Sequence, residues 1–210
     1  MSRWMLSRRI LLGLSILALA LSAPGPAVAG PPTDQVKVST DHVLKILQDA
    51  ELKKPAKAEE RRKQIRTVAN ELFDWGETGK RALARHWQER TPAQREEFSK
   101  LFADLIERSY VSKIEAYSGE KIVYLGDSPD GDLATVKTKL VTKSNTEIPL
   151  DYRLHKVGDK WRAYDVLIEN VSLVANYRSQ FSRIIQQNGY DELIKKLKTK
   201  QEELQFEDKK

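Results

Sequence analysis

Residues that could carry out metal or nucleophilic chemistry are few in this sequence and lie far apart. The chain has 210 residues, no Cys and three His, namely His42, His86 and His155. Without Cys it has no thiol nucleophile, no thiolate metal site and no disulfide. The His residues lack the short spacing of a zinc site. The sequence therefore predicts no metal site, and nothing in it points to a cofactor.

Carboxylates are abundant, but the alternation of the predicted strands turns them away from one face of the sheet. Candidate strands cover residues 121–125, 133–143, 147–157 and 160–169, and the short turns between them favour antiparallel hairpins. Successive side chains of a strand point to opposite faces. The even positions from 134 to 142, from 148 to 154 and from 164 to 168 hold aliphatic residues, Thr and two Tyr, with Arg162 at one end and no Asp, Glu, His or Lys.

This apolar sheet face limits the chemistry of the interior. General acid–base catalysis needs a titratable group that faces the pocket, and the even positions do not supply one. An apolar face can form an ordinary core, as most such faces do, or the wall of a cavity for an apolar ligand. The pattern alone leaves both interpretations open.

The elements around the sheet are predicted to be helices with one apolar face each. Helical spacing predicts one helix through Val36 and Leu47, behind a flexible leader at residues 30–34, and a second helix that ends near residue 73. After an interruption at residues 75–79, a short helix holds Leu83 and Trp87.

The clearest local signal is a helix start at residues 91–94. Thr91 is placed as the N-cap, Pro92 as the first helical residue and Gln94 as its capping-box partner. An apolar face follows as far as Tyr110. The sequence therefore predicts a long helix that begins at Pro92.

The N-terminus is typical of a secretory signal peptide. Residues 1–29 contain three Arg, a short apolar run and Ala-Val-Ala at the end, so we expect cleavage after Ala29. The apolar run is shorter than the roughly 20 residues of a membrane anchor. Sec export is favoured over the twin-arginine route that the Arg pair suggests. Residues 30–205 are predicted to form one domain and residues 206–210 a disordered charged tail.

Net charge argues against a nucleic-acid-binding protein. The full chain carries a formal charge of +6, and removal of residues 1–29 leaves an excess of +3. Phosphate binding needs a concentrated basic stripe, whereas Lys and acidic residues alternate through this chain. Nucleic acid is therefore not expected as a partner.

Two stretches resemble the MlaC family of periplasmic phospholipid-binding proteins, also known as toluene-tolerance proteins. They are RTPAQREEFSKLFADLIERSY (90–110) and WRAYDVLIENVSLVANYRSQF (161–181). Two departures occur. Asn170 stands where the family usually has Gly, and Ala84 follows Ala82-Leu83 where the family commonly has Gly. Asn tolerates left-handed backbone angles, so the turn at residue 170 is expected to form.

The resemblance implies an α+β fold, an NTF2-like cone in which a curved antiparallel sheet packs against helices around a deep apolar cavity. It implies a periplasmic carrier, not an enzyme, that holds phospholipid acyl chains. Its expected partners are an inner-membrane ABC transporter complex and an outer-membrane lipoprotein/porin complex, between which it shuttles lipid to maintain outer-membrane asymmetry. Nothing in the sequence requires more than a monomer.

The expected lipid contacts are the apolar side chains of the sheet and of two helices. In this interpretation the strand at 161–169 and the helix from Ser172 face each other across the lipid. For each residue, ordinary core packing remains the alternative. The expected contacts are Phe102, Leu105, Tyr110, Val136, Leu140, Leu150, Tyr152, Leu154, Tyr164, Val166, Ile168, Val174, Tyr177 and Phe181.

Several polar and aromatic residues receive secondary predictions. Asp165 and Glu169 are expected to cap a helix or to pair with Arg178, and Trp75 and Trp87 to lie at the cavity mouth, where an amphipathic ring suits a boundary between apolar and wet surfaces. Two other functions stay open: an enzyme on the same cone, which needs a carboxylate or His inside, and a periplasmic adaptor with a solid core and no ligand.

Overall fold

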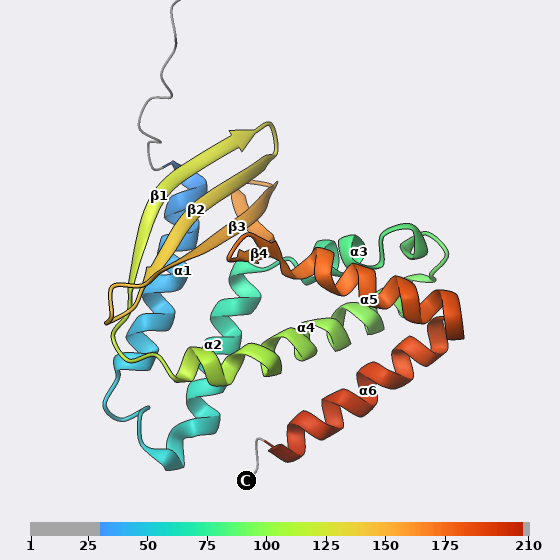
Figure 1. Ribbon diagram of the computed structural model, residues 1–210, viewed down its shortest axis with the longest axis horizontal. Coiled ribbons are helices and arrows are strands. Elements are labelled where there is room, and N and C mark those ends of the chain that lie inside the picture. Colours follow the sequence, from blue (N-terminus) through green and yellow to red (C-terminus); the bar gives the residue numbers. More distant parts are fainter. Residues whose placement is uncertain (1–29, 208–210) are drawn as a thin grey trace, which may run out of the picture.

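A computed structural model describes residues 30–207 of the chain (Figure 1). The predicted signal peptide at 1–29 and the end of the predicted tail at 208–210 lie outside these residues. No helix within the described range is both long enough and apolar enough to cross a bilayer.

A five-stranded antiparallel sheet follows the order of the chain, β1-β2-β3-β4-β5, and helices cover its concave side (Figure 1). The fold is therefore α+β with a curved sheet packed against helices, as predicted. The strands are β1 (Lys121–Asp130), β2 (Leu133–Val141), β3 (Glu147–Val157), β4 (Lys160–Ile168) and β5 (Val171–Ser172). The helices are α1 (Pro31–Gln48), η1 (Pro55–Lys57), α2 (Ala58–Leu72), α3 (Trp75–Leu83), η2 (Ala84–Trp87), α4 (Pro92–Glu115), α5 (Leu173–Asn188) and α6 (Tyr190–Glu207).

The start of α4 confirms the local prediction. The Thr91 hydroxyl accepts a hydrogen bond from the Gln94 amide, and the Gln94 side chain accepts one from the Thr91 amide, which completes the capping box. Two amide groups without helical partners are thereby satisfied. The sequence signal is local, and the structure follows it.

The start of α1 differs from the prediction, because residues 30–34 are not a flexible leader. The helix begins at Pro31. An Asp127 carboxylate oxygen from β1 accepts hydrogen bonds from the amides of Gly30 and Thr33, at 2.9 and 3.1 Å, and from the Thr33 hydroxyl at 2.7 Å. Because this cap comes from a distant strand, no local sequence pattern predicts it.

Three other boundaries also differ. Residues 75–79 do not interrupt the helices but form the start of α3, for which the Asp74 side chain is the N-cap. β1 extends past residue 125 to Asp130, because a bulge between Tyr124 and Gly126 keeps it paired with β2. At the other end of the chain, α6 continues through Glu207, whereas a disordered tail was expected from residue 206.

Between β4 and α5 the chain makes a tight hairpin. Glu169 and Asn170 have positive φ angles of 51° and 65°, and they link the paired residues Ile168 and Val171. Two successive residues with positive φ are the mark of a type I′ hairpin turn. Asn170 thus adopts the left-handed geometry expected for it, and the hairpin places the start of α5 beside β4.

The apolar core is divided into three clusters. One joins α3, α4, α5 and α6 around Phe98 and Phe102, a second joins α1 and α2 to the sheet around Val136 and Leu154, and a third joins the far ends of α1 and α2 around Ile65. The helical layer of α3 to α6 extends to one side of the sheet (Figure 1). The space between the three clusters is the site described next.

Candidate lipid-binding cavity

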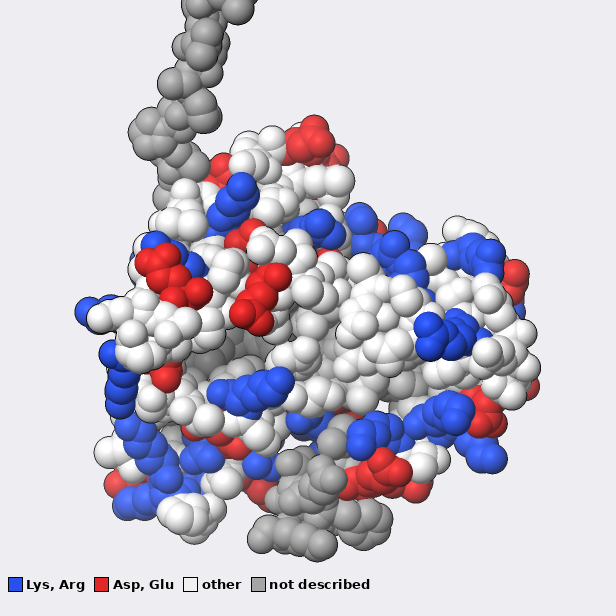
Figure 2. Space-filling model, viewed as in Figure 1, with Lys and Arg blue, Asp and Glu red and all other residues white. Residues whose placement is uncertain are grey.

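A cavity of about 720 Å³ lies between the concave face of the sheet and helices α1, α2 and α4. Its walls are mainly aliphatic and aromatic, and residues of all three core clusters contribute to it. Figure 2 shows a hollow in the surface between the sheet and the helices, on the face seen in Figure 1. The concave sheet face therefore lines an open space.

Eight of the fourteen residues predicted from the sequence line this cavity. They come from α4, from β2, β3 and β4, and from the first turn of α5, because the even positions of those strands share the concave face. They are Tyr110, Leu140, Leu150, Tyr152, Tyr164, Val166, Ile168 and Val174.

The other six predicted residues belong to the packed core and are absent from the cavity wall. Val136 and Leu154 are fully buried between the sheet, α1 and α2. Phe102, Leu105, Tyr177 and Phe181 pack in the cluster of α3 to α6, where Phe102 contacts the rings of Tyr177 and Phe181 at centroid distances of 5.1 and 5.2 Å. For these six the alternative of ordinary core packing describes the structure.

The same packing corrects the expectation that α5 faces β4 across the lipid. Only Leu173 and Val174, at the start of α5, reach the cavity. The rest of the helix turns Tyr177 and Phe181 toward α4. The apolar face of α5 is thus used to join helices, and β4 faces α1, α2 and α4 across the cavity instead.

Residues of α1, α2 and α4 supply much of the wall that sequence reasoning missed. Their apolar faces were recognisable from helical spacing, but the spacing does not say which neighbour a face will meet. These additional lining residues include Val43, Leu44, Leu47, Ile65, Val68, Ala69, Leu72, Ile106 and Ile114.

One buried carboxylate, that of Asp165, lies at the cavity wall, in contrast to the expectation of a sheet lining without acidic groups. Arg153 pairs with Asp165 and Leu154 with Ala163, so Tyr164 is an extra residue, and the bulge places Ala163 on the face of Leu154. Asp165 lies opposite Arg153 and is only 3% exposed, because the start of α5 covers it. Strict period-two counting cannot anticipate such a bulge.

The contacts of Asp165 make it an anchor for α5. Its two oxygens accept hydrogen bonds from the Ser172 hydroxyl at 2.6 Å and from the Val174 amide at 3.1 Å, and Arg153 lies 3.3 Å away. The predicted capping role is therefore confirmed. The predicted pair with Arg178 is wrong, since Arg178 donates to the backbone carbonyl of Arg81.

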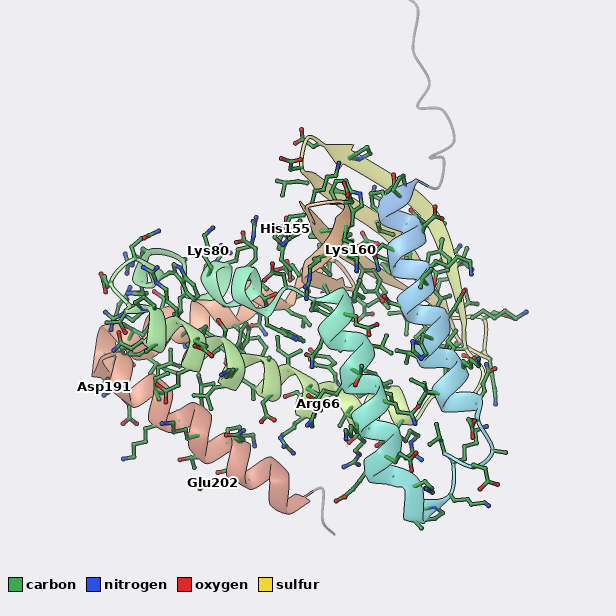
Figure 3. All side chains as sticks on the ribbon, turned by 180° about the vertical axis from the view of Figure 1, so that it is seen from behind. Arg66, Lys80, His155, Lys160, Asp191 and Glu202 are labelled. Carbon is green, nitrogen blue, oxygen red and sulfur yellow. The ribbon has the colours of Figure 1, made fainter. Side chains whose placement is uncertain are left out.

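The remaining charged side chains at the wall come from the helices and from the segment before β1. They are Arg62, Arg66, Glu107, Lys113 and Glu120. Arg66 lies where α2 passes α4, on the side shown in Figure 3. Within the described residues, no three His, Asp or Glu side chains gather in the manner of a metal site.

The two tryptophans take different positions. Trp75 lines the cavity and stacks on Phe73 with a centroid distance of 4.9 Å, while its indole N–H donates to the Asn70 side chain at 2.8 Å. Trp87 does not line the cavity but an outer groove between α2, α3 and α4, which Trp75 also lines. Trp75 thus lies at the boundary between the two spaces.

Burial raises the pKa of the Tyr152 phenol to about 12. An ordinary tyrosine in an unfolded chain titrates near 10. Below about pH 10 the Tyr152 phenol is neutral in both the folded and the unfolded protein. Between about pH 10 and 12 the phenol loses its proton in the unfolded chain but keeps it in the folded protein. The free energy of unfolding should therefore fall by about 1.4 kcal/mol per pH unit in this range.

Urea unfolding between about pH 9 and 12 tests this expectation. The variant Tyr152→Phe should lose stability less steeply than the wild type, while Tyr190, whose pKa burial also raises to about 12, remains in both proteins. Equal slopes for the two proteins would contradict the placement of a neutral phenol at this wall.

Known proteins match this chain in sequence and in structure. A family model described as "MlaC protein" matches residues 37–199. The intermembrane phospholipid transport system binding protein MlaC of Haemophilus influenzae is 27% identical over 124 residues, which cover 57% of this chain and 58% of that protein. Toluene tolerance protein ttg2D of Pseudomonas putida is 26% identical over 102 residues, 48% of this chain and 47% of the relative. This chain thus spans about half the length of the curated relatives it matches.

A solved structure shares the fold. The phospholipid-binding protein from Ralstonia solanacearum, determined in complex with a phospholipid, superimposes with a TM-score of 0.73 at 23% identity, over 83% of this chain and 99% of that one. This likeness supports the architecture of sheet and helices. Because the family model covers nearly all of the described residues, the chain belongs to the MlaC family.

Proposed function

We propose that this protein is a periplasmic phospholipid carrier that encloses acyl chains in the cavity between its sheet and helices. The observation that carries the proposal is the cavity of about 720 Å³ with its mainly apolar wall. Sites that enclose small molecules measure about 300–1,000 Å³. The names of the relatives, which refer to phospholipid transport and binding, support the same ligand class.

The energetics of burial favour a carrier that releases lipid only when docked. Each buried CH₂ contributes about 0.8 kcal/mol, so a sixteen-carbon chain gains on the order of 12 kcal/mol on leaving water. Two chains reach the practical limit of non-covalent affinity, roughly 18–21 kcal/mol. Spontaneous release into water is then too slow for transport, and partner complexes must open the cavity and accept the chains.

The partners in this proposal are an outer-membrane lipoprotein/porin complex and an inner-membrane ABC transporter complex. Shuttling between them would maintain the lipid asymmetry of the outer membrane. The signal-like sequence of residues 1–29 supports export, and the Sec route is favoured over the twin-arginine route. An enzymatic function has less support, because the oxygens of Asp165 are already engaged by Ser172, Val174 and Arg153.

Lipid analysis of the purified protein tests the proposal directly. We expect native mass spectrometry to show bound phospholipid and solvent extraction to recover about one phospholipid per protein. The bound lipid should persist through prolonged dialysis in plain buffer, since the chains have no favourable route into water. A folded protein that carries no phospholipid after export, and that takes none from vesicles, would contradict the carrier function and favour the adaptor.

A further inference from the structure

The outer groove between α2, α3 and α4 shares a wall with the cavity. The groove has a volume of about 540 Å³, and five of its residues also line the cavity, namely Arg66, Asn70, Trp75, Ala103 and Glu107. Figure 2 shows the hollow of the cavity on one face, and Figure 3 shows Arg66 on the reverse view. The groove therefore adjoins the cavity at the wall that holds Arg66.

An ion pair crosses this shared wall. The Arg66 Nε atom donates to both carboxylate oxygens of Glu107, at 2.6 and 2.7 Å, and the Arg66 Nη2 atom lies 2.5 Å from Glu107 Oε1. Arg66 belongs to α2 and Glu107 to α4. The pair thus links the two helices at the point where the cavity and the groove meet.

A second, more buried ion pair joins the same helices nearer the end of α4. Glu115 accepts hydrogen bonds from Arg61 Nη2 at 2.7 Å and from Arg62 Nε at 3.0 Å, and its side chain is 12% exposed. At the shared wall the side chains of Arg66 and Glu107 are 46% and 19% exposed, against 16% and 12% for Arg61 and Glu115. Because exposed ion pairs are weaker than buried ones with several hydrogen bonds, the link at Arg66 should open first and the one at Glu115 should act as the hinge.

The groove does not have the properties of an anion site. Its cations already have partners: Lys100 pairs with Glu96 at 2.6 Å, and Arg95 donates to the carbonyl oxygens of Trp87 and Gln88. Its apolar part comprises Trp75, Trp87 and Ala103. The other lining residues of the groove are mostly charged or polar. A hydrocarbon chain can lie against the three apolar side chains, whereas the cations of the groove are already engaged.

We propose that the groove is a second, lateral exit for an acyl chain, and that the Arg66–Glu107 ion pair is the latch that closes it. The proposal rests on the carrier function proposed above. When the latch parts, α2 and α4 separate at the shared wall and a chain passes between Trp75 and Ala103 into the groove. A receiving membrane or protein complex would then accept the chain from the groove, without passage through water.

Transfer of a pyrene-labelled phosphatidylglycerol from the protein to phosphatidylethanolamine/phosphatidylglycerol vesicles tests the latch. Glu107→Gln and Arg66→Gln should each accelerate transfer roughly three- to tenfold, the range that loss of a bidentate ion pair implies. Salt should accelerate the wild type and leave Glu107→Gln unchanged. The charge-swapped double variant Arg66→Glu/Glu107→Arg should restore a rate near that of the wild type.

Glu97→Gln is the matched control, because it removes an ion pair between α4 and Lys198 of α6, 2.8 Å long and distant from the cavity. Its transfer rate should equal that of the wild type. Normal lipid content with unchanged rates in the Arg66 and Glu107 variants would overturn the latch and leave the carrier function intact. Loss of lipid in the Arg66 variants, without rescue by the swap, would identify a headgroup contact instead and likewise overturn it.

Cross-linking tests the route itself. The chain has no Cys, so the double variant Asn70→Cys/Ala103→Cys can be bridged by a flexible bismaleimide without competing reactions. Both positions lie on the shared wall, one on α2 and one on α4. Transfer from the bridged protein should be at least tenfold slower than transfer from the same double variant capped with N-ethylmaleimide, which adds bulk at both positions without joining α2 to α4. An unchanged rate in the bridged protein would show that chains leave through the hollow of Figure 2 and would overturn the lateral exit.

Discussion

Leu150→Glu should abolish phospholipid retention. Leu150 lies on β3 in the concave face of the sheet and lines the cavity opposite the helices. A carboxylate at this position would have to be desolvated by the acyl chains, which costs several kcal/mol unless it finds a partner. We expect at least a hundredfold lower phospholipid content per protein, measured by solvent extraction and lipid mass spectrometry.

The same substitution on the opposite face of the sheet provides the control. Leu133→Glu adds a carboxylate to the sheet at a side chain that is 39% exposed, so its lipid content should match the wild type. Circular dichroism establishes that each variant is folded, and the smaller change Leu150→Asn replaces Leu150→Glu if the latter does not fold. Normal lipid content in a folded Leu150 variant would place the ligand elsewhere.

Phe102→Ala should produce the largest loss of stability, about 3–5 kcal/mol. The Phe102 side chain is fully buried, and its ring contacts Phe98, Tyr177 and Phe181 at centroid distances of 5.7, 5.1 and 5.2 Å. Removal of the ring leaves a hole among close-packed aromatic groups that cannot collapse easily. Urea unfolding monitored by circular dichroism measures the effect.

This variant also separates core packing from lipid contact. Because Phe102 is absent from the cavity wall, the folded fraction of Phe102→Ala should keep its phospholipid. Val157→Ala, at an exposed position on the sheet, should change the free energy of unfolding by less than about 0.5 kcal/mol. A stable Phe102→Ala that loses its lipid would mean that the ring lines the ligand site after all.

Sequence reasoning succeeded where the determining interactions are local. The capping box of Thr91 and Gln94 lies within four residues and correctly predicted the start of α4. The alternation of β2 and β3 correctly placed Leu140, Leu150 and Tyr152 on one face. Both signals depend only on residues adjacent in the chain.

It failed where a distant residue decides the outcome. Asp127 caps α1 from a strand 94 or more residues away. The sequence around residues 30–34 contains no sign of this cap, so the start of α1 was predicted to be a flexible leader. The bulge at Tyr164 exists only in the pairing of β3 with β4, and it moves Ala163 to the face of Leu154. The burial of Asp165 depends on the start of α5, which the chain reaches only after the next turn. Helical spacing placed Phe102 and Phe181 on the apolar faces of their helices, but it could not show that these two faces pack against each other. The cavity wall is instead lined by residues of α1 and α2.

The division of the core into three clusters has a thermodynamic consequence. The cavity occupies the place where those clusters would otherwise merge, and its wall draws on all of them. A guest that touches all three clusters would couple them to one another. Loading would then increase the cooperativity of folding.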